Sequence, residues 1–334
     1  MKVSMHQATY AAAALEGIVE EMRLNPEIFT IGQIVGRHAN TFYPGIGQLE
    51  EEFGRGRVRP AGIIERFIAG AGVGAALAGG RALVDMSRAA FSTLAFDEIF
   101  AKAGMWRYEH GSNGDMNMRV VYRMTYDSYE PAGAEHARVG TSHFMRGVGL
   151  KVAVPTTPSD AKGLIKTALR DDDPVVFMQH RKLFEAEGQV PDDEYLVPFG
   201  EANIVREGAD CTVVAVGYMV QLASEAAIVL EEQGVGVEII DPRTLVPLDL
   251  ETILASVGKT RHLVVVDEDF QRCGVGAEIG FRVQEELFDT LAGPVRRVDN
   301  PNVPVPNARN LRGVVLPTSE KIVAAVTESL RATI

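Results

Sequence analysis

The sequence of 334 residues is poor in cysteine and has no long apolar run. Its two cysteines, Cys211 and Cys273, lie far apart and form no CxxC pair, which argues against a disulfide framework and favours a reducing compartment. The longest weakly polar run, Phe67 to Gly80, is shorter than the roughly 20 residues that a bilayer-spanning helix needs. No sufficiently apolar region precedes Glu16, which argues against a signal peptide. These absences predict a soluble, cytoplasmic protein with no membrane partner.

An excess of positive charge is also missing. Lys and Arg number 33 against 45 Asp and Glu, a formal net charge of −12, which argues against a nucleic-acid partner. The hydrophobic content of 46% is typical of a globular protein, and 334 residues favour two domains. The sequence contains no GxxxxGK[ST], HExxH or GxSxG motif, which removes several common enzyme classes.

Strand and helix patterns alternate along both halves of the chain. In the first half we expect a helix over Gln7–Met22, a strand over Ile28–Gly32, a helix capped by Ser159 and a strand over Pro174–Gln179. In the second half the expected elements are Cys211–Gly217, Val220–Glu232, Val237–Asp241, Leu250–Val257, His262–Glu268 and Gly276–Leu291. Apolar strands alternating with helices predict an α/β fold of two domains, with mainly parallel sheets flanked by helices. The acidic, proline-punctuated stretch 185–200 predicts a linker over residues 186–203, between domains at 1–185 and 204–334.

Glycines gather in the stretch GAGVGAALAGG, from Gly70 to Gly80. Its spacing is GxGxG rather than the GxGxxG of a dinucleotide-binding loop, and no strong strand precedes it. We therefore expect a helix whose small residues allow a close approach to another helix or to a ligand.

One glutamate, Glu65, stands just ahead of this stretch among apolar residues. Glutamate is seldom buried unless it is paired. Arg66 cannot easily be the partner, because successive residues point to different sides of a helix. Composition alone favours a structural role for Glu65 over a catalytic one.

Two other groups of ionisable residues could bind a metal. His136 and His143 are seven residues apart, which is not a known zinc spacing, so surface or interface histidines are the default interpretation. The run RDDDP, Arg170 to Pro174, fits either a solvated helix end or a loop for a hard cation.

The order of the motifs resembles the beta subunit of the thiamine-diphosphate-dependent first component of 2-oxo acid dehydrogenase complexes. This family includes the pyruvate, branched-chain and acetoin dehydrogenases and belongs to the transketolase-like superfamily. The similarity runs nearly from end to end, over the blocks Phe53–Val58, Ile63–Gly80, Phe96–Ile99, Gly149–Phe177, Val237–Thr260 and Gly274–Ile279. The resemblance implies a transketolase-like pyrimidine-binding domain followed by a transketolase C-terminal-like domain.

The resemblance also implies roles for single residues. Glu65 matches the glutamate that bonds N1′ of the cofactor's aminopyrimidine, where a carboxylate favours the imino tautomer that acts as a base. Ile63 and Phe91 match the positions that border and stack on that ring. His136 matches a histidine near the reacting centre, as a second catalytic residue. Asp171 and Asp173 lie in a loop that resembles a monovalent-cation (K⁺) site.

Several positions depart from the family pattern. The family's Gln-His-Ser-Gln is Glu135-His136-Ala137-Arg138 here, and Arg146 replaces a second histidine. Gln-Phe-Ala-Asp before the pyrimidine aromatic is replaced by residues 87–90, Ser-Arg-Ala-Ala. Gly-Glu-Asp is replaced by residues 32–34, Gly-Gln-Ile. Cofactor binding is therefore better supported than the usual substrate.

The GDG…N segment that holds the diphosphate through Mg²⁺ is missing, and NGDMN at 113–117 lacks the second glycine and the long spacing. In the family that segment belongs to the alpha subunit. The resemblance thus implies a heterotetramer of two alpha and two beta subunits that acts on a small 2-oxo acid or an acetoin-like substrate, with a lipoyl-bearing acyltransferase as a further partner.

Two alternatives remain open at this point. One is the C-terminal half of a split transketolase-like enzyme, which shares the fold and the glutamate. The other is a degenerate, non-catalytic interaction subunit, suggested by the substitutions around His136.

Overall fold

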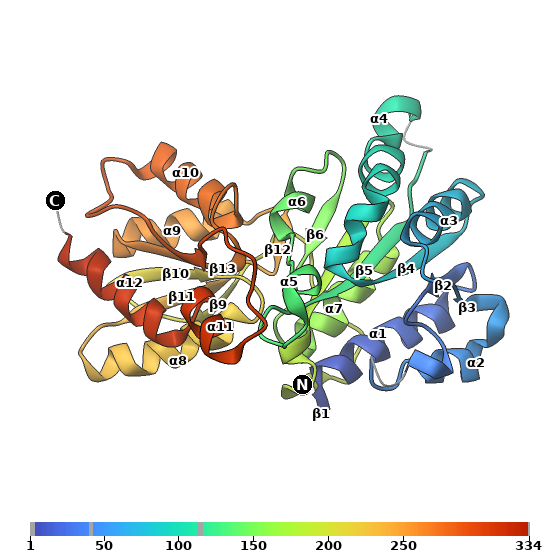
Figure 1. Ribbon diagram of the computed structural model, residues 1–334, viewed down its shortest axis with the longest axis horizontal. Coiled ribbons are helices and arrows are strands. Elements are labelled where there is room, and N and C mark those ends of the chain that lie inside the picture. The colour runs from blue at the N-terminus through green and yellow to red at the C-terminus, as the bar shows by residue number, and fades with distance from the viewer. Residues whose placement is uncertain (1–3, 40–42, 112–115, 333–334) are drawn as a thin grey trace. The chain divides into compact units, whose positions relative to one another are not determined.

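The computed structural model describes residues 4–39, 43–111 and 116–332 (Figure 1). It divides into two compact units, one of residues 1–126 and 143–199 and one of residues 127–142 and 200–334. This division is not linear along the chain, in contrast to the expected domains at 1–185 and 204–334. Residues 113–115 of the NGDMN segment lie outside the described residues.

The first unit contains a parallel sheet in the order β6-β7-β5-β4-β2-β3. Its strands are β2 (Ile28–Gly32), β3 (Val58–Pro60), β4 (Arg81–Arg88), β5 (Val120–Tyr126), β6 (Lys151–Ala153) and β7 (Val175–His180). Every residue of β5 and β7 is buried, so the sheet is covered on both faces, as the apolar strand patterns predict. A separate antiparallel pair joins β1 (Met5–Thr9) to β8 (Glu187–Pro191).

Helices surround this sheet. They are α1 (Tyr10–Leu24), α2 (Gly47–Arg57), α3 (Glu65–Leu77), α4 (Trp106–His110) and α7 (Pro158–Arg170), with shorter turns η1 (Arg37–Ala39), η2 (Ala89–Ala95) and η4 (Arg181–Leu183) and a π-helix η3 (Asp97–Gly104). The short helix α6 (Thr141–Met145) begins in the second unit and ends in the first. Helices α1 and α7 lie side by side. Gly17 permits this contact, because a Cβ there would lie 2.7 Å from Cγ2 of Ile165 and 2.9 Å from the carbonyl oxygen of Lys162.

The second unit contains a sheet in the order β14-β13-β10-β11-β9, in which only β9 is antiparallel. Its strands are β9 (Asn203–Arg206), β10 (Cys211–Ala215), β11 (Val237–Asp241), β13 (Leu263–Phe270) and β14 (Arg296–Asn300), and the short β12 (Thr244–Val246) belongs to the same unit. The helices are α5 (Gly133–His136), α8 (Met219–Glu232), α9 (Leu250–Thr260), α10 (Val275–Leu287), α11 (Arg309–Val315) and α12 (Ser319–Arg331). In Figure 1, α9 and α10 lie on one side of this sheet and α8 and α12 on the other.

Three local predictions need correction. Residues 187–191 of the expected linker form β8, because their backbone pairs with β1 from the other end of the unit. Helix α7 is capped by Thr157 rather than Ser159; Pro158 suits the first helical position, and the Thr157 hydroxyl accepts from the Asp160 amide at 3.1 Å. His136 and His143 lie in two separate short helices, α5 and α6, rather than on one helical face. Among the described helices, none is both long and apolar enough to cross a bilayer.

Candidate functional site

Glu65 is the first residue of α3 and lies just beyond the end of β3. Gln33 directly follows β2, which is the parallel neighbour of β3, so both residues lie at the same edge of the sheet. The Gln33 side-chain amide donates a 2.8 Å hydrogen bond to Oε1 of Glu65. Glu65 is only 6% exposed, yet its Oε2 has no hydrogen-bond partner among the described residues. The site thus presents a largely buried carboxylate with one oxygen that can accept a bond from a ligand.

The helix behind Glu65 packs closely on the sheet. A Cβ at Gly72 would lie 2.4 Å from Cγ2 of Val84 in β4, so any larger residue would push α3 away. The predicted small-residue helix is confirmed, but its close neighbour at Gly72 is strand β4 rather than another helix or a ligand. The amino-terminal end of α3 also favours the negative charge of Glu65.

Apolar side chains around Glu65 are left uncovered. Ile63 is 80% exposed, and Ile64 and Phe67 are each 58% exposed. Leu94 of η2 is exposed as well. Arg66 points away to Glu98, with its Nε 2.9 Å from Oε1, so it is not the partner of Glu65, as expected. Exposed apolar residues gathered around one buried carboxylate are typical of a binding surface rather than of a finished core.

Phe91 lies in η2, which directly follows β4 and packs against α3. Its ring is half-buried. The end of β4 is irregular, because its register with β5 shifts between Asp85 and Arg88 and Ser87 has a φ of 61°. Glu65 and Ile63 follow β3 and Phe91 follows β4, the two strands that flank β2 in the sheet of the first unit.

A buried ion pair stands within the same sheet. Arg123 of β5 donates from Nε and Nη2 to Oδ2 of Asp85, at 3.0 and 2.7 Å. The guanidinium also lies 4.1 Å from the ring centroid of Tyr43, whose hydroxyl accepts from the Gln179 amide at 3.2 Å. This pair ties β4 to β5 and fixes the strands whose ends carry the candidate site.

His136 ends helix α5 in the second unit. Its Nδ1 lies 3.0 Å from the carbonyl oxygen of Ala132, so this nitrogen must carry a hydrogen and donate. In the neutral ring Nε2 then has no hydrogen and can accept a proton. Arg138 bonds the carbonyl oxygen of Glu135 at 3.2 Å, which braces the short helix.

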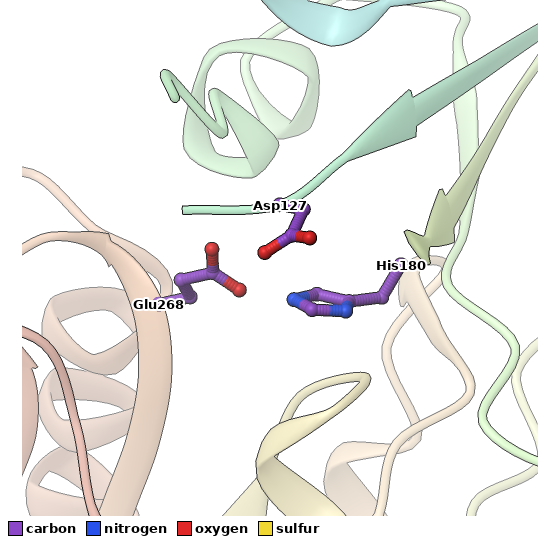
Figure 2. A group of neighbouring side chains, drawn as sticks. All are labelled: Asp127, His180 and Glu268. Carbon is purple, nitrogen blue, oxygen red and sulfur yellow. The ribbon is translucent and has the colours of Figure 1, made fainter. Parts of the chain in front are cut away.

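The second unit holds two buried carboxylates that sequence reasoning missed. Figure 2 shows Asp127 and Glu268 pointing toward one another, and their nearest ligand oxygens lie within 4.8 Å; it also labels His180, the last residue of β7. The amide of Ser128 donates to Glu268 at 2.5 Å, and that of Tyr129 to Asp127 at 2.7 Å. Asp127 directly follows β5, and Glu268 lies in β13 after its run of four apolar residues, which was the available sequence signal. These oxygens accept bonds from their own unit's backbone.

A third carboxyl group, that of Asp267, is buried beside Glu268 in the same strand. Burial raises the pKa of Asp267 well above its usual value, and the neighbouring carboxylate of Asp269 adds to the shift. Asp269 itself accepts from the hydroxyl and amide of Ser142 at 2.8 and 3.1 Å.

The loop of Asp171 and Asp173 lies elsewhere in the first unit. It precedes β7 and follows α7, whereas Gln33 and Phe91 follow the ends of their strands. Both oxygens of Asp171 accept from Nζ of Lys151, at 2.8 and 2.7 Å. Asp173 pairs with Arg107 at 2.9 Å. The structure therefore does not bring these two carboxylates together with Glu65.

Comparisons with known families cover both units. Residues 6–186 match the family described as the transketolase pyrimidine-binding domain, and residues 200–322 match the transketolase C-terminal domain. A split-gene transketolase, solved as an inactive beta4 tetramer, superposes with a TM-score of 0.77 at 22% identity, covering 98% of this chain and 99% of that chain. The predicted fold class is confirmed.

Curated relatives match over nearly the whole chain. The pyruvate dehydrogenase E1 component subunit beta of Rhizobium meliloti (strain 1021) is 38% identical, over 96% of this chain and 70% of the relative. The beta subunit of acetoin:2,6-dichlorophenolindophenol oxidoreductase of Cupriavidus necator is 37% identical, over 95% of each. The 2-oxoisovalerate dehydrogenase subunit beta of Bacillus subtilis (strain 168) is 35% identical, over 97% of this chain and 99% of the relative.

Proposed function

Because this chain belongs to the family of pyruvate, acetoin and 2-oxoisovalerate dehydrogenase beta subunits, we propose that it binds the aminopyrimidine of thiamine diphosphate and works as half of a 2-oxo acid or acetoin-like dehydrogenase. The observation that carries the proposal is Glu65. It is buried, its Oε1 accepts from a neutral amide, and its Oε2 faces no described partner. A largely buried carboxylate with one oxygen left open can take a charge-assisted hydrogen bond from a ligand.

The residues present fit the aminopyrimidine. Oε2 of Glu65 would bond the ring nitrogen N1′, while Gln33 keeps Oε1 in place. Ile63 and Phe91 would supply the apolar surfaces that a flat heteroaromatic ring needs. When bound, the cofactor supplies a nucleophilic carbon that can attack the carbonyl of the substrate. The task of Glu65 would be to hold a proton at N1′, in a bond that becomes stronger when the ligand and a partner exclude water.

His136 is proposed as the proton donor and acceptor for the substrate. Its Nδ1 is engaged by the Ala132 carbonyl, so Nε2 is the nitrogen that can exchange a proton with a reacting oxygen. The neighbouring Glu135 and Arg138 differ from the family pattern, which suits a substrate other than the usual one.

A partner chain is needed to complete the site. The exposed side chains of Ile63, Ile64, Phe67 and Leu94 give a partner an apolar surface beside Glu65. The sequence has no GDG…N segment, so we propose that an alpha subunit holds the diphosphate and Mg²⁺, in an assembly of two alpha and two beta subunits. A lipoyl-bearing acyltransferase would be the next partner if the acyl group leaves on lipoamide. K⁺ at Asp171 and Asp173 is left out of this proposal, because both carboxylates already face cationic side chains.

The proposal is tested by titrating thiamine diphosphate into the assembly of this chain with its alpha subunit, in the presence of Mg²⁺, by calorimetry. Glu65→Gln should weaken binding roughly 10- to 100-fold, the worth of one charged hydrogen bond. Glu52→Gln, which removes a carboxylate bonded to Arg23 at 2.5 and 2.8 Å, is the control and should bind as the wild type does. Equal affinity of the Glu65→Gln variant and the wild type would reject the role of Glu65.

Turnover separates this function from a split transketolase. The assembly should convert 2-oxo acids or acetoin and leave ketose phosphates untouched. The curated relatives at 35 to 38% identity support the dehydrogenase, whereas the transketolase match at 22% identity supports the fold alone.

A further inference from the structure

The loop Asp171–Asp173, here called the carboxylate loop, has three consecutive acidic residues between α7 and β7. Four cationic side chains surround it. Arg81, Arg119 and Lys151 stand at or just before the starts of β4, β5 and β6, and Arg107 lies in α4. Because these strands are parallel, their starts and the start of β7 meet at one edge of the sheet. This edge is opposite to the strand ends that Gln33 and Phe91 follow.

Arg81 bonds the backbone of the loop. Its Nη1 donates to the carbonyl oxygens of Leu169 and Asp171, at 2.8 and 2.6 Å. Its Nη2 lies 3.3 Å from Oδ1 of Asp172. The Arg81 side chain is 11% exposed, so one nearly buried guanidinium joins two carbonyls at the end of α7 to a carboxylate. Carbonyls at a helix end need such partners.

The remaining cations bond the carboxylates. Lys151 bonds both oxygens of Asp171 and lies 3.3 Å from Oδ2 of Asp173. Arg119 donates to Oδ1 of Asp172 at 2.7 Å, and Arg107 pairs with Asp173 at 2.9 Å.

The backbone of the loop is satisfied in the same way. The amide of Asp173 donates to Oδ1 of Asp171 at 2.8 Å, and the amide of Met118 donates to the carbonyl oxygen of Asp172 at 2.9 Å. An alkali ion needs several carbonyl or carboxylate oxygens to replace its hydration shell. Here those oxygens already accept from N–H groups. The four positive side chains also balance the charge of the nearby carboxylates, Glu27 included, so these carboxylates need no further cation.

We propose that this chain replaces a monovalent metal ion at the carboxylate loop with its own side chains, and that Arg81 occupies the central position. The K⁺ site that the family resemblance implies at Asp171 and Asp173 does not fit the bonds observed there. The first unit then folds, and holds β4 to β7 in register, without K⁺.

Thermal unfolding of the full chain tests this inference. The probes are KCl and tetramethylammonium chloride at equal ionic strength, because the larger ion cannot enter an oxygen-lined site. The wild type should show the same Tm in both salts, within about 1 °C. Arg81→Met leaves two carbonyls and a carboxylate without their guanidinium, and should lower Tm by roughly 4 °C or more. The matched control is Arg23→Met, which removes an exposed arginine bonded to Glu52 and should change Tm by less than about 1 °C.

Two results would overturn the proposal. One is a saturable rise of the wild-type Tm with K⁺ but not with tetramethylammonium. The other is an Arg81→Met variant as stable as the Arg23→Met control. If Arg81→Met does not fold, crystals of the wild type soaked in RbCl decide: no anomalous peak at the loop supports the inference, and a peak among the oxygens of residues 169–173 contradicts it.

Discussion

Two regions of the first unit bury a glutamate, and they do so in different ways. Glu21 lies between α1 and α7 at 3% exposure, and Glu65 begins α3 at 6% exposure. Both oxygens of Glu21 accept from Arg170, at 2.6 to 3.0 Å, so its charge is balanced within the unit. The side chain of Glu65, in contrast, accepts from the neutral amide of Gln33. Burial alone therefore does not identify a site; an incompletely bonded carboxylate beside exposed apolar residues does.

The side chains around Glu21 and around Glu65 also differ in how completely they are bonded and buried. Around Glu21, Lys166 is fully buried and bonds Glu20 at 2.6 Å and Glu194 at 2.5 Å. Around Glu65, three apolar side chains are more than half exposed. The first region is a completed interface between two helices, and the second region is the one at which we propose that a ligand and a partner bind.

The largest expected effect is on Glu65. Glu65→Gln should lower turnover of the assembly at least about 100-fold, because an amide cannot hold the proton that the aminopyrimidine needs. Its Tm should stay within about 2 °C of the wild type, since no charged partner is lost. Steady-state kinetics measures the turnover, and thermal unfolding of the same preparation measures the Tm. Normal turnover of the Glu65→Gln variant would show that Glu65 has no more part in catalysis than Glu21.

Glu21→Gln should show the opposite pattern. It removes the carboxylate that accepts three bonds from Arg170, so the free energy of unfolding should fall by roughly 2 kcal/mol, less than for a fully buried pair because Arg170 is partly exposed and keeps Glu194. Turnover per folded molecule should not change. Urea unfolding and active-site-normalised kinetics measure the two quantities, and a loss of turnover without a loss of stability would contradict the structural role.

Glycine-to-alanine variants in α1 and α3 should change the stability of the chain in opposite directions. Gly17→Ala places a Cβ 2.9 Å from the Lys162 carbonyl and should destabilise the chain by roughly 1 to 3 kcal/mol. Gly74→Ala meets nothing within 4 Å in α3 and should stabilise the chain by about 0.5 to 1 kcal/mol through the better helix propensity of alanine. Chemical denaturation of each variant tests the prediction, which fails if both changes have the same sign.

The smallest effect is a pH dependence of the α1–α7 region. Partial burial raises the pKa of Glu20, but bonds from Lys162 and Lys166 outweigh it and hold the pKa below its usual 4.5. A lowered carboxyl pKa stabilises the fold above about pH 4.5, and this contribution is lost as the pH falls through the native value. Glu20→Gln should therefore flatten the fall in Tm between about pH 5 and 3, by a degree or two. A Tm profile identical to that of the wild type would show that these bonds contribute nothing.

The sequence predicted the three central strands of the second unit and helices α8, α9 and α10, whereas β9, β14, α11 and α12 were not predicted. Val237–Asp241 was expected as a strand and is β11, and helix α8 begins one residue before the expected Val220. These elements are continuous apolar runs or clear helical patterns, so local composition determines them. Strand β8 was missed because it is short, partly exposed and defined by its pairing with β1, about 180 residues away.

The candidate site was predicted in part. The role of Glu65 came from a family resemblance, and its burial could not be read from local sequence. Gln33 entered the sequence reasoning only as a departure from the family pattern, since its bond to Glu65 depends on β2 and β3 lying side by side. The four cations of the carboxylate loop are scattered between residues 81 and 151, so only the fold brings them to Asp171–Asp173.

A crystal structure of this chain with its alpha subunit, thiamine diphosphate and Mg²⁺ would show directly whether Glu65 binds the aminopyrimidine. We expect N1′ of the aminopyrimidine to lie within about 3 Å of Oε2 of Glu65, while Gln33 still bonds Oε1. A cofactor whose N1′ faces another residue, with Glu65 left in contact with protein alone, would contradict it.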